Sequence, residues 1–135
     1  MDAIAVRVET EINPTEAEDK VKTAVANLFG NIPVYIKPMH KGSVMTAEAK
    51  EQDALVKLRD LLRNDRVRDA ARKVFLAGLR GETISFCLNK QVAFAGHVSF
   101  SDDEAESPLG PIRVVIECEN PRQLIDWLAP RTTKN

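Results

Sequence analysis

Apolar residues recur at every second position near both ends of the chain and at helical spacing between these segments. In residues 3–12, Ile4 and Val6 open an alternation of apolar and charged side chains. A period of two predicts a strand with one buried side and one side in water. The same alternation returns in residues 84–88 and 113–118. Strands of this kind around helical segments predict an α+β fold.

The first predicted helix follows the first strand. Thr15 and Glu18 have the spacing of a capping box, in which a hydroxyl and a carboxylate accept hydrogen bonds from free N–H groups at a helix start. Apolar residues then follow at helical spacing as far as Leu28, and Gly30 is suited to end the helix. We therefore predict a helix between Thr15 and Gly30.

The middle of the chain carries two apolar stripes that one straight helix cannot bury together. The first stripe consists of Leu55, Leu58, Leu61 and Leu62, and the second of Val67, Ala70, Ala71, Val74 and Gly78. At about 100° per residue, the two stripes point to nearly opposite sides of a helix over residues 53–80. A break at Asn64-Asp65, residues suited to a left-handed stop and a new N-cap, resolves the conflict. We predict two consecutive helices, the second ended by Gly81.

Four further elements complete the prediction. Prolines bracket a strand at residues 34–37, and a weaker strand at residues 43–50 could instead continue into the next helix. Residues 92–100 alternate like a strand, with a bulge expected at Gly96. A last helix over residues 122–128 has a proline at its first turn.

The predicted order is β-α-β-β-α-α-β-β-β-α, an α+β two-layer sandwich with a mostly antiparallel sheet and helices on one face. Residues 1–131 are predicted to form one domain, and residues 132–135 a frayed C-terminal tail. The other face of the sheet is expected to stay partly open. It is predicted to carry Arg7, Glu9, Tyr35, Lys37, Cys87, Ala93, Ala95 and Arg113.

Composition excludes several classes of protein. With 44% hydrophobic and 29% charged residues, the 135-residue chain is too apolar to be disordered. No apolar run approaches the roughly 20 residues that span a bilayer. The opening Met1-Asp2 does not begin a signal peptide. We predict a cytoplasmic protein without a membrane partner.

No side chains have recognisable catalytic or metal-ligand spacing. Cys87 and Cys118 have no neighbouring ligand residues, and His40 and His97 have no paired nucleophile. A structural or surface role is favoured for both histidines, although either could be a general base in some fold. The acidic run at residues 102–106 lacks the calcium-loop pattern and is interpreted as a solvated loop rather than a cation site. We predict no enzyme activity, no metal and no cofactor.

The net charge of −1 hides a basic middle segment. Residues 55–81 hold eight basic and three acidic side chains. Such a surface can contact nucleic-acid phosphates. Basic residues among acids also describe the outside of an ordinary helix, and pairs such as Asp69 with Lys73 can simply neutralise each other. The candidate RNA-binding residues are Arg59, Arg63, Arg66, Arg72, Lys73 and Lys90.

Lys90 lies in Asn89-Lys90, the tight connection expected between two strands. Its side chain could contact an RNA backbone or fix the turn, and both interpretations stay open. For Asn89 the structural role is favoured, with a left-handed backbone. Aromatic residues for base stacking are sparse, and Tyr35 is the one expected at the surface.

Residues 88–96, LNKQVAFAG, and residues 108–112, PLGPI, resemble a small archaeal family of uncharacterised proteins that carries the label RNA binding. Residues 13–16, 63–72 and 126–130 match the same family in the same order. The resemblance implies archaeal origin and a fold like that of the ribosomal protein called L-five. It implies no catalytic residues, and the family's label is itself an inference from the fold.

The leading hypothesis is a non-catalytic RNA-binding protein that contacts the backbone and shape of structured RNA. It predicts salt-sensitive binding that weakens when Arg66, Arg72 and Lys73 are changed to Ala. The alternative is a protein–protein interaction module, such as a homodimer, that uses the open sheet face or an edge strand. Light scattering together with RNA binding separates the two.

Overall fold

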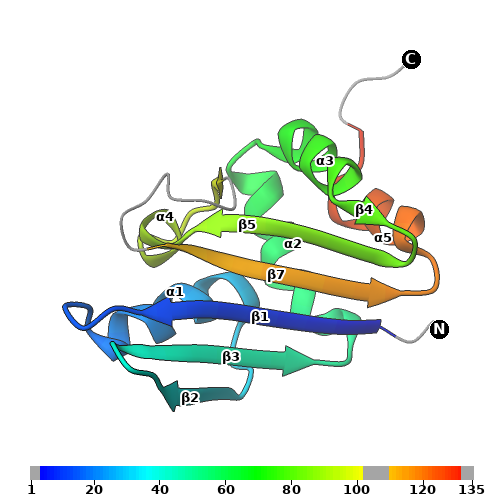
Figure 1. The fold of residues 1–135 in the computed structure, drawn as a ribbon. Coiled ribbons are helices and arrows are strands. Elements are labelled where there is room, and N and C mark those ends of the chain that lie inside the picture. Colours follow the sequence, from blue (N-terminus) through cyan, green and yellow to red (C-terminus); the bar gives the residue numbers. More distant parts are fainter. Residues whose placement is uncertain (1–3, 102–109, 132–135) are drawn as a thin grey trace.

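The computed structural model of the chain describes residues 4–101 and 110–131. In this part of the chain one sheet runs in the order β2-β3-β1-β7-β5-β4, and the short β6 pairs with β5 (Figure 1). The strands are β1 (Ile4–Ile12), β2 (Val34–Pro38), β3 (Ser43–Ala49), β4 (Leu79–Arg80), β5 (Thr83–Asn89), β6 (Phe100–Ser101) and β7 (Pro111–Cys118). The pairs are antiparallel, which confirms the predicted arrangement.

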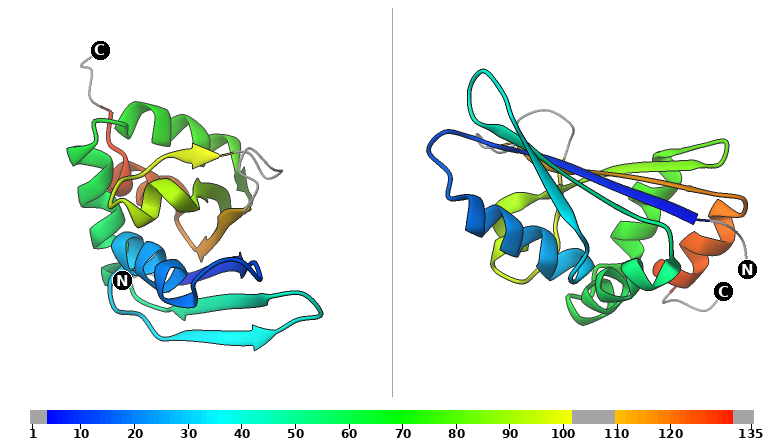
Figure 2. Two further views of the ribbon diagram at one scale, coloured as in Figure 1. Left: turned by 90° about the vertical axis from the view of Figure 1, so that its left-hand side faces the viewer. Right: turned by 90° about the horizontal axis from the view of Figure 1, so that it is seen from below.

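Helices cover one face of this sheet and leave the other face open (Figure 2). They are α1 (Glu18–Phe29), α2 (Val56–Asn64), α3 (Arg68–Ala77), α4 (Lys90–Phe94) and α5 (Pro121–Leu128), and a 3₁₀ turn, Gln52–Leu55, leads into α2. The view from below in Figure 2 places the strands on one side and these helices on the other. The predicted α+β two-layer sandwich is confirmed.

The hydrophobic core lies between the two layers. Alternate residues of β1, beginning with Ile4, turn toward the helices and are buried. Under α3, the rings of Phe75, Phe86 and Phe100 have centroids 4.8 to 6.0 Å apart. Each fully buried side chain of this size stabilises the fold by about 1.5–3 kcal/mol. This packing fixes the helices on the sheet, and with them the surfaces that the helices present outward.

The predicted break between the two middle helices is confirmed. The Val67 N–H donates to the Leu62 carbonyl at 3.1 Å. The Arg66 N–H donates to the Arg63 carbonyl at 3.2 Å. These two hydrogen bonds form a Schellman motif, in which one residue takes a left-handed conformation. That residue is Arg66, with φ of 58°, and not the predicted Asn64-Asp65 pair.

The predicted end of the second middle helix at Gly81 is wrong. α3 ends at Ala77 because Gly78 meets β5: the Ser85 N–H donates to the Gly78 carbonyl at 3.1 Å. A Cβ atom at Gly78 would clash with the Ser85 carbonyl oxygen, so a larger residue does not fit. The chain continues as β4, and Gly81, with φ of 61°, turns it into β5.

The strand predicted over residues 92–100 is also wrong. Residues 90–94 form α4 instead, and pairing with β5 resumes at β6. Asn89 has an extended backbone rather than the predicted left-handed one, and its side-chain oxygen accepts a hydrogen bond from the Val92 N–H at 2.9 Å. This N-cap satisfies one of the free N–H groups at the helix start. Gly96, with φ of 87°, lies in the turn after the helix rather than in a bulge.

The predicted capping box at the first helix is wrong as well. Glu18 is the first residue of α1, so Thr15 lies too far before the helix to cap it. Glu16 accepts hydrogen bonds from the backbone N–H and the side-chain amide of Asn13, at 2.9 and 2.8 Å. The loop before the helix is therefore fixed by Glu16. The predicted stop at Gly30 is confirmed.

One row of side chains crosses the open face of the sheet. The register places in line Cys87, Arg113, Glu9, Thr46 and Tyr35. Tyr35 is 67% exposed, as predicted. Ala93 and Ala95 do not belong to this face, because Ala93 lies in α4 and Ala95 in the turn after it. The row carries charges of both signs.

Candidate nucleic-acid interface

The six predicted RNA-binding residues come from four segments of the helical layer. Arg59 and Arg63 belong to α2, Arg66 to the turn after it, Arg72 and Lys73 to α3, and Lys90 to α4. The structure does not gather all six on one surface. Arg72 and Lys90 are engaged in ion pairs within the protein.

Arg72 holds α3 against α5. Its Nη1 atom lies 2.7 Å from Asp126 Oδ1 and donates to the Ala129 carbonyl at 3.3 Å. The Arg72 side chain is only 19% exposed. Because its charge is neutralised and its fork is oriented toward α5, Arg72 is not a free phosphate ligand in this conformation.

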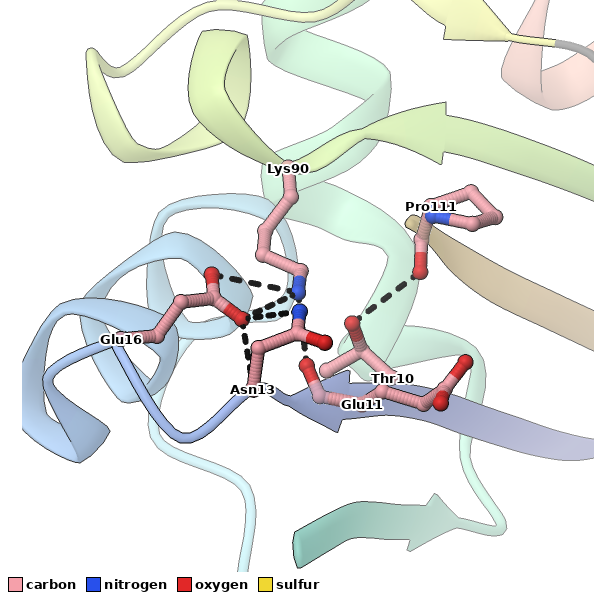
Figure 3. A network of polar contacts seen from close by, with 6 residues as sticks. All are labelled: Thr10, Glu11, Asn13, Glu16, Lys90 and Pro111. Carbon is pink, nitrogen blue, oxygen red and sulfur yellow. Dashed lines mark hydrogen bonds and ion pairs between the residues drawn. The ribbon is translucent and has the colours of Figure 1, made fainter. Parts of the chain in front are cut away.

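Lys90 lies in a buried polar network that joins α4 to the loop before α1 (Figure 3). Its ammonium lies 3.0 Å from Glu16 Oε1 and donates to the Glu11 carbonyl at 2.6 Å. The Lys90 and Glu16 side chains are only 4% and 10% exposed. This geometry favours the structural interpretation of Lys90, because a phosphate cannot reach an ammonium that is buried and already paired.

The same network sets the ionisation of Glu16. Burial of the carboxyl raises its pKa, but hydrogen bonds from Asn13, together with the hydrogen bond and charge of Lys90, outweigh burial. The pKa of Glu16 therefore falls below its usual 4.5, and the group is ionised at neutral pH. Since the charges of Glu16 and Lys90 cancel, the network ties the fold together and offers no net charge to a ligand.

A cavity of about 370 Å³ opens beside this network, between the start of α1 and α4. Buried Val21 forms part of its wall, and the Lys20 ammonium lies 5.7 Å from the centre of the Phe94 ring. Phe94 is 44% exposed, so the expectation that Tyr35 is the one aromatic residue at the surface is wrong. In the lining of this cavity Glu16 neutralises Lys90, which leaves the charge of Lys20.

Three arginines converge on a smaller hollow of about 40 Å³, where α2, α3 and the end of α5 meet. Its lining consists of Arg59, Arg63, Arg68, Leu128 and Pro130. Guanidinium groups around a concave site are typical of phosphate recognition, because their planar forks donate paired hydrogen bonds to oxyanions. We call this site the arginine hollow.

Arg59 is held in place from two sides. Its Nε donates to the Trp127 carbonyl at 3.1 Å, and its guanidinium carbon lies 4.9 Å from the centre of the Trp127 ring. Stacking on an aromatic face and a hydrogen bond orient this guanidinium before any ligand arrives. Such pre-orientation lowers the entropy cost of binding.

Arg63 and Arg68 complete the hollow. A nitrogen of Arg63 lies 3.6 Å from an oxygen of Asp60, and both side chains are about half exposed. An exposed pair of this kind contributes about 0–1 kcal/mol, so a phosphate can compete with it. Arg68 is the first residue of α3 and is half-buried. Arg66 and Lys73 are exposed and add positive charge to the same helical segment.

Arg68 is the member of the arginine hollow that sequence reasoning missed. It lies three residues before Ala71, which is fully buried, so helical periodicity assigns Arg68 to the inner flank of α3. Only the turn at Arg66 brings this flank to the end of α2. The sequence signal for Arg68 was its position two residues after Arg66. The direction of its side chain, however, depends on the turn at Arg66.

The two histidines, for which the sequence favours a structural or surface role, lie apart from the arginine hollow. His97 Nδ1 lies 3.1 Å from Asp65 Oδ1, and the Val98 N–H donates to Asp65 Oδ2 at 2.9 Å, which fastens the α2–α3 turn to the segment after α4. His40 is exposed. No three His, Cys, Asp or Glu side chains of residues 4–101 and 110–131 are placed to hold a metal ion. The acidic run at residues 102–106 lies outside the described part.

The sequence predicts no membrane-spanning segment. Within the described part of the chain, no helix combines the length and apolar character that crossing a membrane requires.

A family model described as RNA binding matches residues 5–118 of the chain. The chain belongs to this family. A UPF0201 protein of Sulfurisphaera tokodaii is 45% identical over 94% of this chain and 88% of its own length. A UPF0201 protein of Sulfolobus acidocaldarius is 43% identical over 96% of this chain and 89% of its own length. The predicted membership of an archaeal family labelled RNA binding is confirmed.

The fold of the RNA-binding family is also seen in a solved relative. The crystal structure of a UPF0201 protein from Methanococcus jannaschii is 30% identical, covers 96% of this chain and 95% of that chain, and superposes with a TM-score of 0.85. The two folds therefore agree along nearly their whole length. The likeness to the ribosomal protein called L-five stays a prediction.

Proposed function

We propose that this protein binds structured RNA without catalysing a reaction, and that the arginine hollow holds backbone phosphates. The observation that carries the proposal is the convergence of Arg59, Arg63 and Arg68, from two helices, on one concave site. Arginine is suited to this role because its guanidinium stays charged and matches phosphate geometry. Membership of the RNA-binding family supports the same conclusion.

Recognition through phosphates and shape fits the placement of the aromatic residues. Among the described residues, Tyr35 and Phe94 are the exposed aromatic side chains. Tyr35 lies on the open sheet face, away from the helices, and Phe94 lines the cavity between α1 and α4. Neither lines the arginine hollow. Contacts there carry no base sequence information, because phosphate contacts position a protein and base contacts specify the sequence.

Fluorescence anisotropy with a labelled RNA hairpin at low salt tests the proposal. The joint change Arg63→Gln and Arg68→Gln removes two charges from the hollow and is expected to weaken binding by at least about tenfold, as for the loss of charged hydrogen bonds. The control is Arg7→Gln with Lys37→Gln, which removes the same charge from the open sheet face. Its expected effect is smaller than about twofold when the variants are compared at about 0.1 M salt, because charges more than about 10 Å away are then largely screened.

Two outcomes would overturn this proposal. If the wild-type protein does not bind the hairpin at low salt, RNA binding is wrong. If the two double variants weaken binding equally, attraction is diffuse and the arginine hollow is not the contact. Thermal unfolding of each variant establishes that the compared proteins are folded.

A second candidate function is pairing of two copies through the open sheet face. It is favoured by Tyr35, which is 67% exposed at the end of the cross-strand row and has no role in the core. Light scattering at increasing concentration tests this candidate, with Tyr35→Ser as the variant. A stable dimer that Tyr35→Ser dissociates supports it, and a monomer at all concentrations contradicts it.

A further inference from the structure

The arginine hollow is small compared with sites that hold a whole small molecule. Its volume is about 40 Å³, far below the roughly 300–1,000 Å³ of pockets for whole small molecules. Leu128 and Pro130 form its apolar side. A hollow of this size suits one small oxyanion group better than a base or a sugar.

The charge of the site exceeds that of an ordinary backbone phosphate. Arg59, Arg63 and Arg68 bring three positive charges, and Asp60, paired with Arg63, brings one negative charge. A phosphodiester in an RNA chain carries one negative charge. A phosphomonoester carries about −1.5 to −2 at pH 7, because its second pKa is about 6. The balance of about two positive charges therefore matches a phosphomonoester better than a phosphodiester.

We infer that the arginine hollow binds a phosphomonoester group, the phosphorylated end of an RNA chain, in preference to internal phosphates. This inference rests on the proposed function and narrows its ligand to a class of RNA ends. Arg59 is oriented by Trp127 and forms the fixed part of the site. Arg63 exchanges its weak pair with Asp60 for the phosphate, and Arg68 donates from the start of α3.

Binding of one RNA hairpin with three kinds of ends tests the inference. The hairpin carries hydroxyl ends, a 5′-phosphate or a 3′-phosphate, with the fluorophore in the loop. The wild-type protein is expected to bind one phosphorylated form about tenfold more tightly than the hydroxyl form, the magnitude of a charged hydrogen bond. Arg68→Gln is expected to abolish this preference, and Arg7→Gln on the open sheet face is expected to keep it.

Inorganic phosphate provides a direct probe of the hollow that does not depend on RNA. Thermal unfolding is followed with increasing inorganic phosphate at constant ionic strength, because a ligand that binds the folded state raises the unfolding midpoint. The wild-type protein and Arg7→Gln are expected to be stabilised. Arg68→Gln is expected to gain no more from phosphate than from chloride.

The outcomes separate the inference from the proposed function. Equal binding of all three hairpins, without stabilisation by phosphate, overturns the phosphomonoester site and leaves RNA binding in place. Stabilisation by phosphate through Arg68, without binding of any hairpin, keeps the phosphate site, assigns it to another phosphomonoester source, and overturns RNA binding. Loss of both signals overturns both.

Discussion

Lys90 and Glu16 lie 74 positions apart in the sequence and form an ion pair of 3.0 Å with almost no exposed surface. The pair connects α4 to the loop between β1 and α1, and the same ammonium holds the Glu11 carbonyl at the end of β1. Two charges removed from water stabilise a fold only while both remain paired. The network therefore accounts for the burial of Lys90.

Replacement of Lys90 by Met is expected to destabilise the protein strongly. Without the ammonium, the Glu16 carboxylate is left buried and unpaired, which costs about 3–5 kcal/mol. The free energy of unfolding in urea measures this loss. The double variant Glu16→Gln with Lys90→Met should recover at least half of it, because the amide stays neutral and still accepts from Asn13. A single variant as stable as the wild type would contradict the structural role of Lys90.

The Glu16 ion pair also predicts a pH dependence. The folded-state pKa of Glu16 lies below 4.5, so the ionised carboxylate contributes stability that is fully present above about pH 4.5. This contribution is lost as the pH falls through the folded-state pKa. The difference in unfolding free energy between the wild type and Glu16→Gln should therefore be largest near pH 7 and shrink below pH 4.5. A difference that stays constant down to pH 3 would argue against an ionised Glu16.

Arg66→Gly is expected to stabilise the fold. Arg66 has φ of 58°, and a left-handed conformation costs a residue with a Cβ atom about 1–2 kcal/mol. Glycine removes this strain but loses more backbone entropy on folding, so the net gain should be about 1 kcal/mol. The thermal midpoint of unfolding measures it. Arg66→Ala, which removes the same charge but keeps a Cβ atom, is the matched control and should not gain stability.

Arg72→Ala is expected to affect stability and leave RNA affinity nearly unchanged. The change breaks the pair with Asp126 and the hydrogen bond to Ala129, at a cost of about 1 kcal/mol. Any effect of the triple change of Arg66, Arg72 and Lys73 on RNA binding should then come from Arg66 and Lys73. Urea unfolding and RNA anisotropy of Arg72→Ala check both parts. A large loss of RNA affinity in a folded Arg72→Ala protein would be inconsistent with this role.

Much of the fold could be predicted because the helices and strands must bury their apolar residues in one shared core, which restricts where each element can begin and end. The break between α2 and α3 follows from two stripes, represented by Leu58 and Ala71, that both had to face the same core. The segment at residues 92–100 could not be predicted in this way. Over so few residues, Val92 and Phe94 suit either one strand face or one helical turn, and the Asn89 cap decides for the helix.

The candidate site could be predicted only in part. The basic content of residues 55–81 directs attention to α2 and α3, where Arg59 and Arg63 indeed line the hollow. Which cations stay free depends on tertiary partners, such as Asp126 beside Arg72. A local pattern does not encode such partners.

The salt dependence of RNA binding tests the central claim, that the arginine hollow contacts RNA phosphates, most directly. The logarithm of the affinity falls linearly with the logarithm of salt concentration, with a slope of about 0.7–0.9 for each phosphate contact. The joint change Arg63→Gln and Arg68→Gln removes two such contacts and should therefore reduce the slope by about 1.4 to 1.8. An unchanged slope in this folded double variant would contradict the claim.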